Sequence, residues 1–224
     1  MKKIGLLGCG AIGTQIALAI DSGKIPAELT HIYDFDGAKA EALLAKLAKK
    51  PTLVANPHLL SSNNVDIVVE AASQEAVKNH ALSILQNKKD LMIMSVGALL
   101  DESVFDILFD ACVEFKKKIY LPSGAIAGLD ALKSVKDELE SVTLTTTKNP
   151  KALAGAKFFS VRNIDVNSIT QKTTIFEGAA KEAVTLFPAN INVAALLHQN
   201  RNIILAKLAG ICELDVKSHY YPSL

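Results

Sequence analysis

The chain has 224 residues, half of them hydrophobic, with 24 Lys and Arg against 23 Asp and Glu and a formal net charge of +1. This near-neutral balance provides no basic surface for nucleic acid or for an anionic membrane, so we expect neither as a partner. No stretch approaches the roughly 18 uninterrupted apolar residues that a membrane-spanning helix needs. The composition is typical of a soluble enzyme with one large or two small domains.

The three cysteines, Cys9, Cys112 and Cys212, are far apart in the sequence and form no Cys-x-x-Cys pair. An odd number at such spacing argues against a disulfide framework and against a structural zinc site. We therefore expect no bound metal, and a reducing cytoplasm is the simplest location for the protein.

The N-terminal segment contains the sequence Gly-Cys-Gly-Ala-Ile-Gly at residues 8–13, between a short apolar run and a helix-like run. A glycine-rich turn that joins a strand to a helix is typical of a dinucleotide-binding site, with the phosphates at the helix N-terminus. Gly8 would permit the tight turn, Gly10 the approach of a pyrophosphate, and Gly13 the close packing of helix on strand. A turn with a packing role alone stays open as the alternative.

A second candidate strand, residues 28–33, ends at the acidic residues Asp34 and Asp36. In dinucleotide-binding domains a carboxylate about 20 residues beyond the glycines binds the ribose hydroxyls of NAD and repels the 2′-phosphate of NADP. Because no arginine lies near Asp34 or Asp36 in the sequence, we expect NAD to be preferred over NADP.

Helical and strand-like segments alternate through the rest of the first half. Helices are expected at residues 36–50, 74–86 and 102–117, and strands at residues 52–55, 66–70, 91–94 and 118–121. Ser73 is the candidate N-cap of the second helix, and the apolar spacing of the third predicts that Ile107 faces the core. This alternation predicts an α/β fold, a Rossmann-type parallel sheet covered on both faces, at residues 1–122.

The loops that follow the strands are rich in glycine, alanine and serine. Ligands of such sheets bind at the carboxyl ends of the strands, and small residues let a flat cofactor lie against the backbone. The expected cofactor contacts are Gly8, Gly10, Ala11, Ile12, Gly13, Asp34, Ala71, Ala72 and Ser95. His31, His58 and His80 are expected to lie away from these loop ends as structural or solvated residues.

The pattern changes in the second half. Residues 141–147 alternate like a strand with one solvated face, residues 169–176 supply further strand-like positions, and residues 179–186 are helix-like. We therefore expect a second, smaller α+β domain at residues 123–224 with some antiparallel pairing. Its expected role is to provide groups for the substrate and a contact between subunits.

Several longer stretches carry a more specific pattern than the glycine-rich turn. They are residues 69–77 (Val-Glu-Ala-Ala-Ser-Gln-Glu-Ala-Val), 95–98, 122–131 (Pro-Ser-Gly-Ala-Ile-Ala-Gly-Leu-Asp-Ala), 145–148 (Thr-Thr-Thr-Lys), 175–184 and 187–195. Together with the turn they resemble the archaeal and bacterial L-aspartate dehydrogenases of NAD biosynthesis. The resemblance extends from Lys3 to about Ala195.

This resemblance implies a homodimeric enzyme that oxidises L-aspartate to iminoaspartate with NAD or NADP. The imine would pass to quinolinate synthase or hydrolyse to oxaloacetate and ammonia. The resemblance further implies that Ala125 and Asn192 contact the cofactor and that a later histidine is the acid/base. His219 stands at about the expected distance beyond Asn192.

After Ala195 the sequence departs from the family's pattern, and the neighbours of His219 do not match it. An exposed histidine in the tail is therefore the alternative interpretation of His219. A displaced reading frame or a truncation would leave a catalytically silent nucleotide-binding homologue. The third hypothesis is a related oxidoreductase that acts on another amino or keto acid.

The chemistry of amine oxidation sets its own requirements. The amine must be uncharged when it loses a hydride, so a base that titrates near neutral pH is needed, most often a histidine. A dicarboxylate substrate also needs donors, and the chain has only two arginines. We therefore expect Ser123, Thr146 and Lys148 to share this task. An ordinary surface lysine is the alternative for Lys148.

Overall fold

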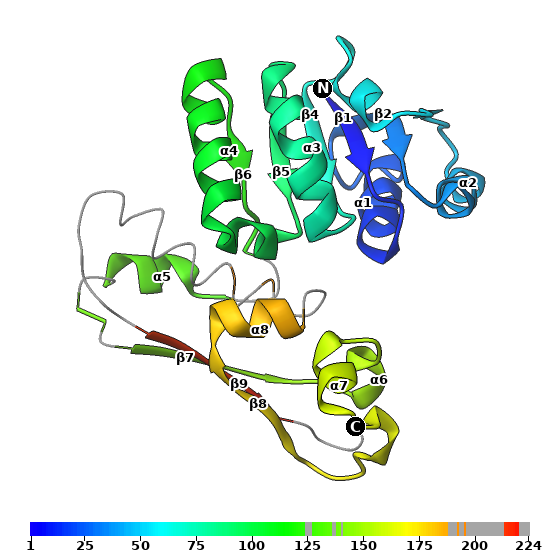
Figure 1. The fold of residues 1–224 in the computed structure, drawn as a ribbon. Coiled ribbons are helices and arrows are strands. Elements are labelled where there is room, and N and C mark those ends of the chain that lie inside the picture. The colour runs from blue at the N-terminus through cyan, green and yellow to red at the C-terminus, as the bar shows by residue number, and fades with distance from the viewer. Residues whose placement is uncertain are drawn as a thin grey trace. The chain divides into compact units, whose positions relative to one another are not determined.

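The structure is a computed structural model. It describes residues 1–123, 127–135, 138, 139, 141–187, 192, 195 and 213–219. The chain divides into two compact units, Met1–Pro122 and Ser123–Leu224, and each is described by itself (Figure 1).

The first unit is built on a six-stranded parallel sheet in the order β3-β2-β1-β4-β5-β6. Its strands are β1 (Lys2–Leu7), β2 (Ala27–Tyr33), β3 (Thr52–Leu53), β4 (Ile67–Glu70), β5 (Asp90–Ile93) and β6 (Ile119–Tyr120). The prediction of a Rossmann-type sheet is confirmed. The chain order reverses between β1 and β4, and ligands of such sheets bind in the crevice at this point.

Four α-helices and two 3-10 helices connect these strands. They are α1 (Ala11–Asp21), α2 (Gly37–Lys46), η1 (Pro57–Ser61), α3 (Gln74–Gln86), η2 (Val96–Leu100) and α4 (Glu102–Phe115). The predicted N-cap is confirmed, because Ser73 Oγ accepts a hydrogen bond from the backbone N–H of Ala76 at 3.1 Å. The expected continuation of α2 to residue 50 is wrong. Asp21 holds the backbone beyond the helix by accepting from the N–H groups of Ala48 and Lys49 at 2.8 and 2.9 Å.

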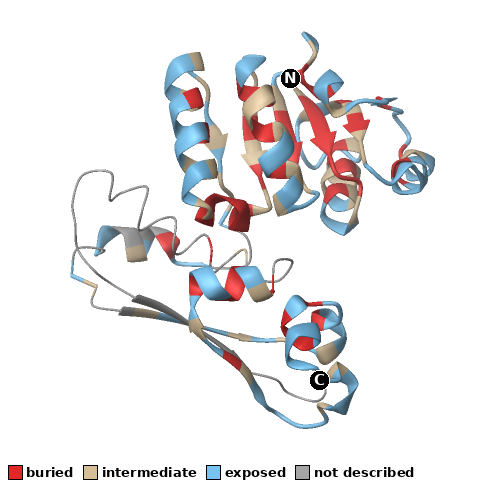
Figure 2. Ribbon diagram, viewed as in Figure 1, coloured by how far each residue is buried: buried red, intermediate tan, exposed pale blue. Residues whose placement is uncertain are grey.

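Apolar side chains bury both faces of the sheet (Figure 2). One cluster joins the sheet to α1 and α2 and includes Leu6, Ile32, Val69, Ala17 and Leu43. The other joins the sheet to α3 and α4 and includes Leu7, Val68, Leu91, Ile84 and Leu108. Burial on both faces explains why these strands appear in the sequence as unbroken apolar runs.

Helix α4 covers its face of the sheet with a narrower stripe than expected. Leu108 and Ala111 are buried, but Ile107 is 51% exposed, so its predicted place in the core is wrong. Consecutive side chains on a helix point about 100° apart. Because α4 lies beside the edge strand β6, it buries Leu108 but leaves its neighbour Ile107 exposed.

The second unit contains a three-stranded sheet in the order β7-β9-β8, in which β9 runs parallel to β7 and antiparallel to β8. Its elements are α5 (Leu129–Ser134), β7 (Ser141–Thr147), α6 (Pro150–Leu153), α7 (Lys157–Arg162), η3 (Val166–Ser168), β8 (Thr174–Ala179), α8 (Ala180–Leu186) and β9 (Glu213–His219). The mixture of strands and helices agrees with the predicted α+β character. The strand expected from residue 169 begins only at Thr174.

Aromatic rings form much of the core of this second unit. The Phe158 and Phe187 rings stack with centroids 5.1 Å apart, and Phe176 meets both of them edge to face. The Arg162 guanidinium lies 5.2 Å from the centroid of the Phe158 ring. In neither unit does a described helix have the length and apolar character needed to cross a membrane.

Candidate functional site

The glycine-rich turn between β1 and α1 lies at the carboxyl end of the sheet. Gly8 has a φ of +102°, and a Cβ placed on it would lie 2.6 Å from the carbonyl oxygen of Ala71. A Cβ on Gly13 would overlap the carbonyl oxygen of Gly8. The fold itself therefore requires glycine at both positions, whether or not a ligand is bound.

Gly10 is different, because a Cβ placed there would meet no other atom within 4 Å. It is the N-cap of α1, which has neither a side-chain cap nor an acidic residue in its first turn. The first N–H groups of an α-helix have no partner within the helix, and its N-terminus favours anions. The open space at Gly10 and the uncapped end of α1 thus form a cradle that suits a phosphate.

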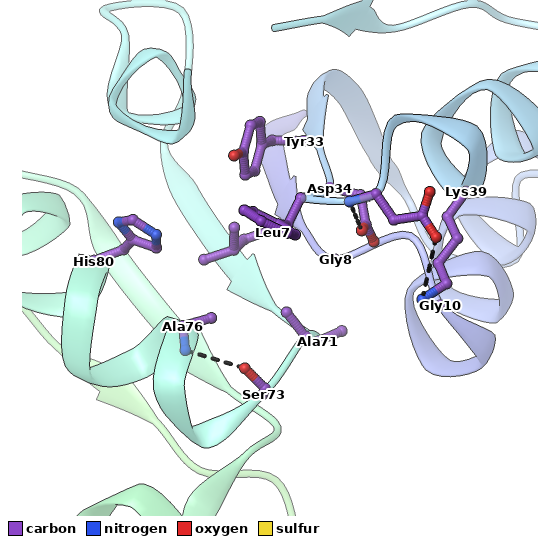
Figure 3. A pocket seen from close by; sticks show the side chains of 13 residues that line it. Leu7, Gly8, Gly10, Tyr33, Asp34, Lys39, Ala71, Ser73, Ala76 and His80 are labelled. Atoms are coloured by element: carbon purple, nitrogen blue, oxygen red, sulfur yellow. Dashed lines mark hydrogen bonds and ion pairs between the residues drawn. The ribbon is translucent and has the colours of Figure 1, made fainter. Parts of the chain in front are cut away.

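A cavity of about 280 Å³ adjoins this turn (Figure 3). Of the predicted cofactor contacts, Gly8, Gly10, Asp34, Ala71 and Ala72 line it. Ala11 and Ile12 lie in the exposed first turn of α1, Gly13 is buried beneath the turn, and Ser95 follows β5. The cavity is thus formed where β1, β2 and β4 end.

Asp34 joins the end of β2 to the glycine-rich turn. One carboxylate oxygen accepts a hydrogen bond from the backbone N–H of Cys9 at 2.6 Å, and the other accepts from the N–H of Asp36 at 2.8 Å. A carboxylate can accept about four hydrogen bonds, so acceptor positions remain on Asp34 for the hydroxyls of a ribose.

Lys39 also lines the cavity, although its position in the sequence did not predict a cofactor contact. Its Nζ atom lies 3.7 Å from a carboxylate oxygen of Asp36, and both side chains are at least half exposed. The spacing of Asp36 and Lys39 in the sequence could have indicated this position. Asp36 is the N-cap of α2, and a residue three positions later lies on the same side of the helix.

The expectation that His80 lies away from the loop ends is wrong, because its side chain lines the cavity from α3, whereas a structural role for His80 stays a prediction. His80 lies four residues after Ala76, one helical turn away, and both residues face the cavity (Figure 3). Its Nδ1 atom is buried without a hydrogen-bond partner among the described residues. Burial, with a contribution from His58, lowers the pKa of His80 and favours the neutral ring.

Cys9 lies inside the glycine-rich turn and is 4% exposed. Burial, with a contribution from the Asp34 carboxylate, raises the pKa of its thiol from 9.0 to about 12. Since the thiolate is the reactive form, we expect iodoacetamide at pH 8 to alkylate Cys9 about a thousandfold more slowly in the folded protein than in the unfolded chain. Peptide mass spectrometry over a time course measures this rate, and equal rates in the two states would contradict the expectation.

The candidate substrate residues belong to the second unit. Thr146 and Lys148 are both half-buried, at alternate positions along and just beyond β7, and Ser123 is exposed. Asn192 is half-buried, whereas Ala125 lies outside the described residues. The backbone of His219 ends β9, opposite Thr147 of β7, and its side chain lies outside the described part of the chain.

The residues present fit a dinucleotide. The first turn of α1 has no side-chain cap, so its N–H groups are available to phosphates, and the Asp34 carboxylate lies beside the cavity with further acceptor positions. Within the described ranges, no group of three His, Cys, Asp or Glu side chains could hold a metal ion. The sheet order and this site together define a dinucleotide-binding protein of the Rossmann class.

Comparisons with known proteins narrow this class. Residues 8–122 match the family model for the NAD-binding domain of homoserine dehydrogenase, and residues 130–200 match the model for the C-terminal domain of aspartate dehydrogenase. The chain is 68% identical over 197 residues to the L-aspartate dehydrogenase of Nitrosopumilus maritimus, covering 88% of this chain and 72% of that protein. The chain belongs to the L-aspartate dehydrogenase family.

Two further matches agree with this assignment. The L-aspartate dehydrogenase of Methanocella arvoryzae is 46% identical over 198 residues, which cover 88% of this chain and 73% of that protein. The crystal structure of aspartate dehydrogenase from Thermotoga maritima superimposes with a TM-score of 0.72 at 28% identity, covering all of this chain and 80% of that one. The expected family and enzyme class are thus confirmed.

Proposed function

We propose that the protein oxidises L-aspartate to iminoaspartate with NAD or NADP, and that it prefers NAD. The observation that carries this proposal is the 68% identity to an L-aspartate dehydrogenase over 197 residues, a length that exceeds the first unit. The glycine-rich turn and the cavity beside it support the cofactor part of the proposal.

The first unit would bind the cofactor, which when bound accepts the hydride from the substrate Cα. The N–H groups of the turn, including those of Ala11 and Ile12, would donate to the pyrophosphate. Asp34 would accept hydrogen bonds from the adenosine ribose, and Ala71 and Ala72 would leave room for the adenosine against the backbone. Ser95, Ala125 and Asn192 would contact the remaining half of the cofactor.

The second unit would bind the substrate and move its proton. Ser123, Thr146 and Lys148 would donate hydrogen bonds to the two carboxylates, and His219 would take a proton from the substrate amine. Loss of this proton and of the Cα hydride converts the amine to an imine. Water then converts the imine to oxaloacetate and ammonia, unless a quinolinate synthase consumes it first.

The test is formation of NADH from NAD with L-aspartate and with a panel of other amino acids and 2-hydroxy acids. Turnover that is highest with L-aspartate is the expected result. Turnover with a different member of the panel would indicate a related oxidoreductase. Binding of NADH without turnover of any substrate would indicate a catalytically silent homologue.

We further propose a cytoplasmic homodimer that passes iminoaspartate to quinolinate synthase. The resemblance to the family supports the dimer and the transfer, and the spacing of the cysteines supports a reducing compartment. Light scattering of the purified protein measures the oligomeric state, and a mass equal to one chain would exclude the dimer.

The preference for NAD follows from the charges around the cavity. Among the described residues that line it, Asp34 and Asp36 contribute two carboxylates and Lys39 contributes one ammonium. We expect NADH to bind about tenfold or more tightly than NADPH at low salt, measured by fluorescence titration. Asp34→Asn, which keeps an acceptor, should narrow this difference, whereas Lys39→Met should widen it. Equal dissociation constants for the two nucleotides in the unmodified protein would refute the preference.

A further inference from the structure

Glu70 is a buried carboxylate at the carboxyl end of β4. It is 1% exposed and is the one ionisable side chain among the buried polar residues of the described chain. One oxygen accepts from the N–H of Ala72 at 2.7 Å and from the hydroxyl of Ser95 at 2.8 Å. The other accepts from the N–H of Ser95 at 3.0 Å. Since every partner is a donor, these contacts fit the ionised carboxylate, which is an acceptor only.

These hydrogen bonds connect the two loops that follow β4 and β5. The first loop also supports the glycine-rich turn, because the N–H of Ala71 donates to the carbonyl oxygen of Leu7 at 2.7 Å. The carbonyl oxygen of Ala71 is the atom that a Cβ on Gly8 would approach to 2.6 Å. A change at Glu70 would therefore shift the backbone on which the turn rests.

The ion pairs described in the first unit, Lys39 with Asp36 and Lys78 with Asp101, do not include Glu70, whose described partners are N–H and hydroxyl donors. Burial raises the pKa of Glu70, and the hydrogen bonds from Ser95 and Ala72 oppose that rise. A charge surrounded by protein is screened little by salt, so its field extends to neighbouring groups.

The sheet order indicates which half of the cofactor would lie near the Glu70 carboxylate. The cavity extends from the turn toward β2 and would take the adenosine, with the pyrophosphate on the turn. The other half of the dinucleotide would then extend past the ends of β4 and β5, beside the loops that Glu70 joins. The nicotinamide ring carries a positive charge in the oxidised cofactor and none in the reduced one.

We propose that Glu70 is a positioning residue of the cofactor site and that its buried charge raises the affinity for the oxidised cofactor relative to the reduced one. This inference rests on the proposed function. It assigns two separable effects to one side chain: the hydrogen bonds hold the loops for either form of the cofactor, and the charge distinguishes the two forms.

The test measures dissociation constants for NAD and NADH by calorimetry in the unmodified protein and in Glu70→Gln. The amide retains one acceptor oxygen and turns an NH₂ group toward an N–H donor, so both affinities should fall. Because the charge is also lost, binding of NAD should weaken about threefold or more beyond that of NADH. A purely structural role would weaken both by the same factor.

Three variants serve as controls. Glu70→Asp keeps the charge but shortens the side chain, and it is the variant that tests positioning. Ser95→Ala leaves the charge but removes one hydrogen bond to Glu70 together with a hydroxyl that would itself contact the cofactor. Both should weaken binding of the two forms by a common factor. Glu75→Gln removes an exposed carboxylate from the first turn of α3 and should leave the ratio of the two constants unchanged.

Several results would overturn the inference. An unchanged ratio in folded Glu70→Gln would exclude the effect of charge, and unchanged constants in Ser95→Ala and Glu70→Asp would exclude positioning. If Glu70→Gln does not fold, the dissociation constants of the unmodified protein are measured at increasing salt concentrations. A preference for NAD over NADH that disappears as salt increases would come from surface charges and would overturn the inference. Absence of binding of either nucleotide to the unmodified protein would instead refute the proposed function.

Discussion

Gly10→Val should abolish binding of NADH and leave the protein folded. A Cβ at this position meets no other atom within 4 Å, and the backbone of Gly10 has φ −69° and ψ −161°, an extended conformation that valine adopts readily. The added methyl groups would occupy the space that a pyrophosphate needs beside the turn. Fluorescence titration with NADH measures the loss, and circular dichroism with thermal melting measures the fold.

Gly13→Val is the matched contrast on the same turn. A Cβ at Gly13 would overlap the carbonyl oxygen of Gly8, so this variant should lose thermal stability before any ligand is added. If Gly10→Val bound NADH as tightly as the unmodified protein, the glycine-rich turn would be a packing turn only. The two variants therefore separate the glycine that a ligand requires from the glycine that the fold requires.

His219→Ala should lower the turnover of L-aspartate about a hundredfold or more while the dissociation constant of NADH stays unchanged. Positioned general bases typically contribute 10²–10⁴-fold, and His219 is not among the residues proposed to contact the cofactor. Initial rates of NADH formation measure the first quantity, and fluorescence titration measures the second. His58→Ala, a change at an exposed histidine of η1, is the control and should retain full turnover.

Two other results would change this interpretation of His219. Full turnover in His219→Ala would exclude His219 as the base and would direct the search to Lys148. Binding of NADH by the unmodified protein without oxidation of L-aspartate would favour the hypothesis of a displaced C-terminal sequence. In that case His219→Ala would bind NADH equally well, because the residues of the turn are unaffected.

The order of strands and helices in the first unit could be predicted because each element carries a local signal. Ser73 before an amphipathic run predicts where α3 begins, and the apolar run that ends at Glu70 predicts a strand buried on both faces. The end of α2 could not be predicted in this way. It depends on hydrogen bonds from Asp21, a residue of a different helix.

The same distinction applies to the candidate site. The turn and Asp34 were predictable, because strand, turn and helix follow one another in the sequence. His80 and Lys39 were missed, since their place in the cavity depends on how α3 and α2 lie against the sheet. One feature of the sequence pointed to Glu70, because it is a carboxylate at the end of a buried strand. Its partner Ser95, however, is 25 residues away and becomes its neighbour only when β4 pairs with β5.

Every described residue that lines the cavity beside the glycine-rich turn comes from the first 80 positions of the chain. Residues 8–122 match a domain described for homoserine dehydrogenase, whereas residues 130–200 match one described for aspartate dehydrogenase. The turn and the described lining of the cavity beside it are thus encoded in one contiguous segment, ahead of the segment that matches aspartate dehydrogenase. Exchange of the second segment alone would therefore leave the residues of this turn and cavity unchanged.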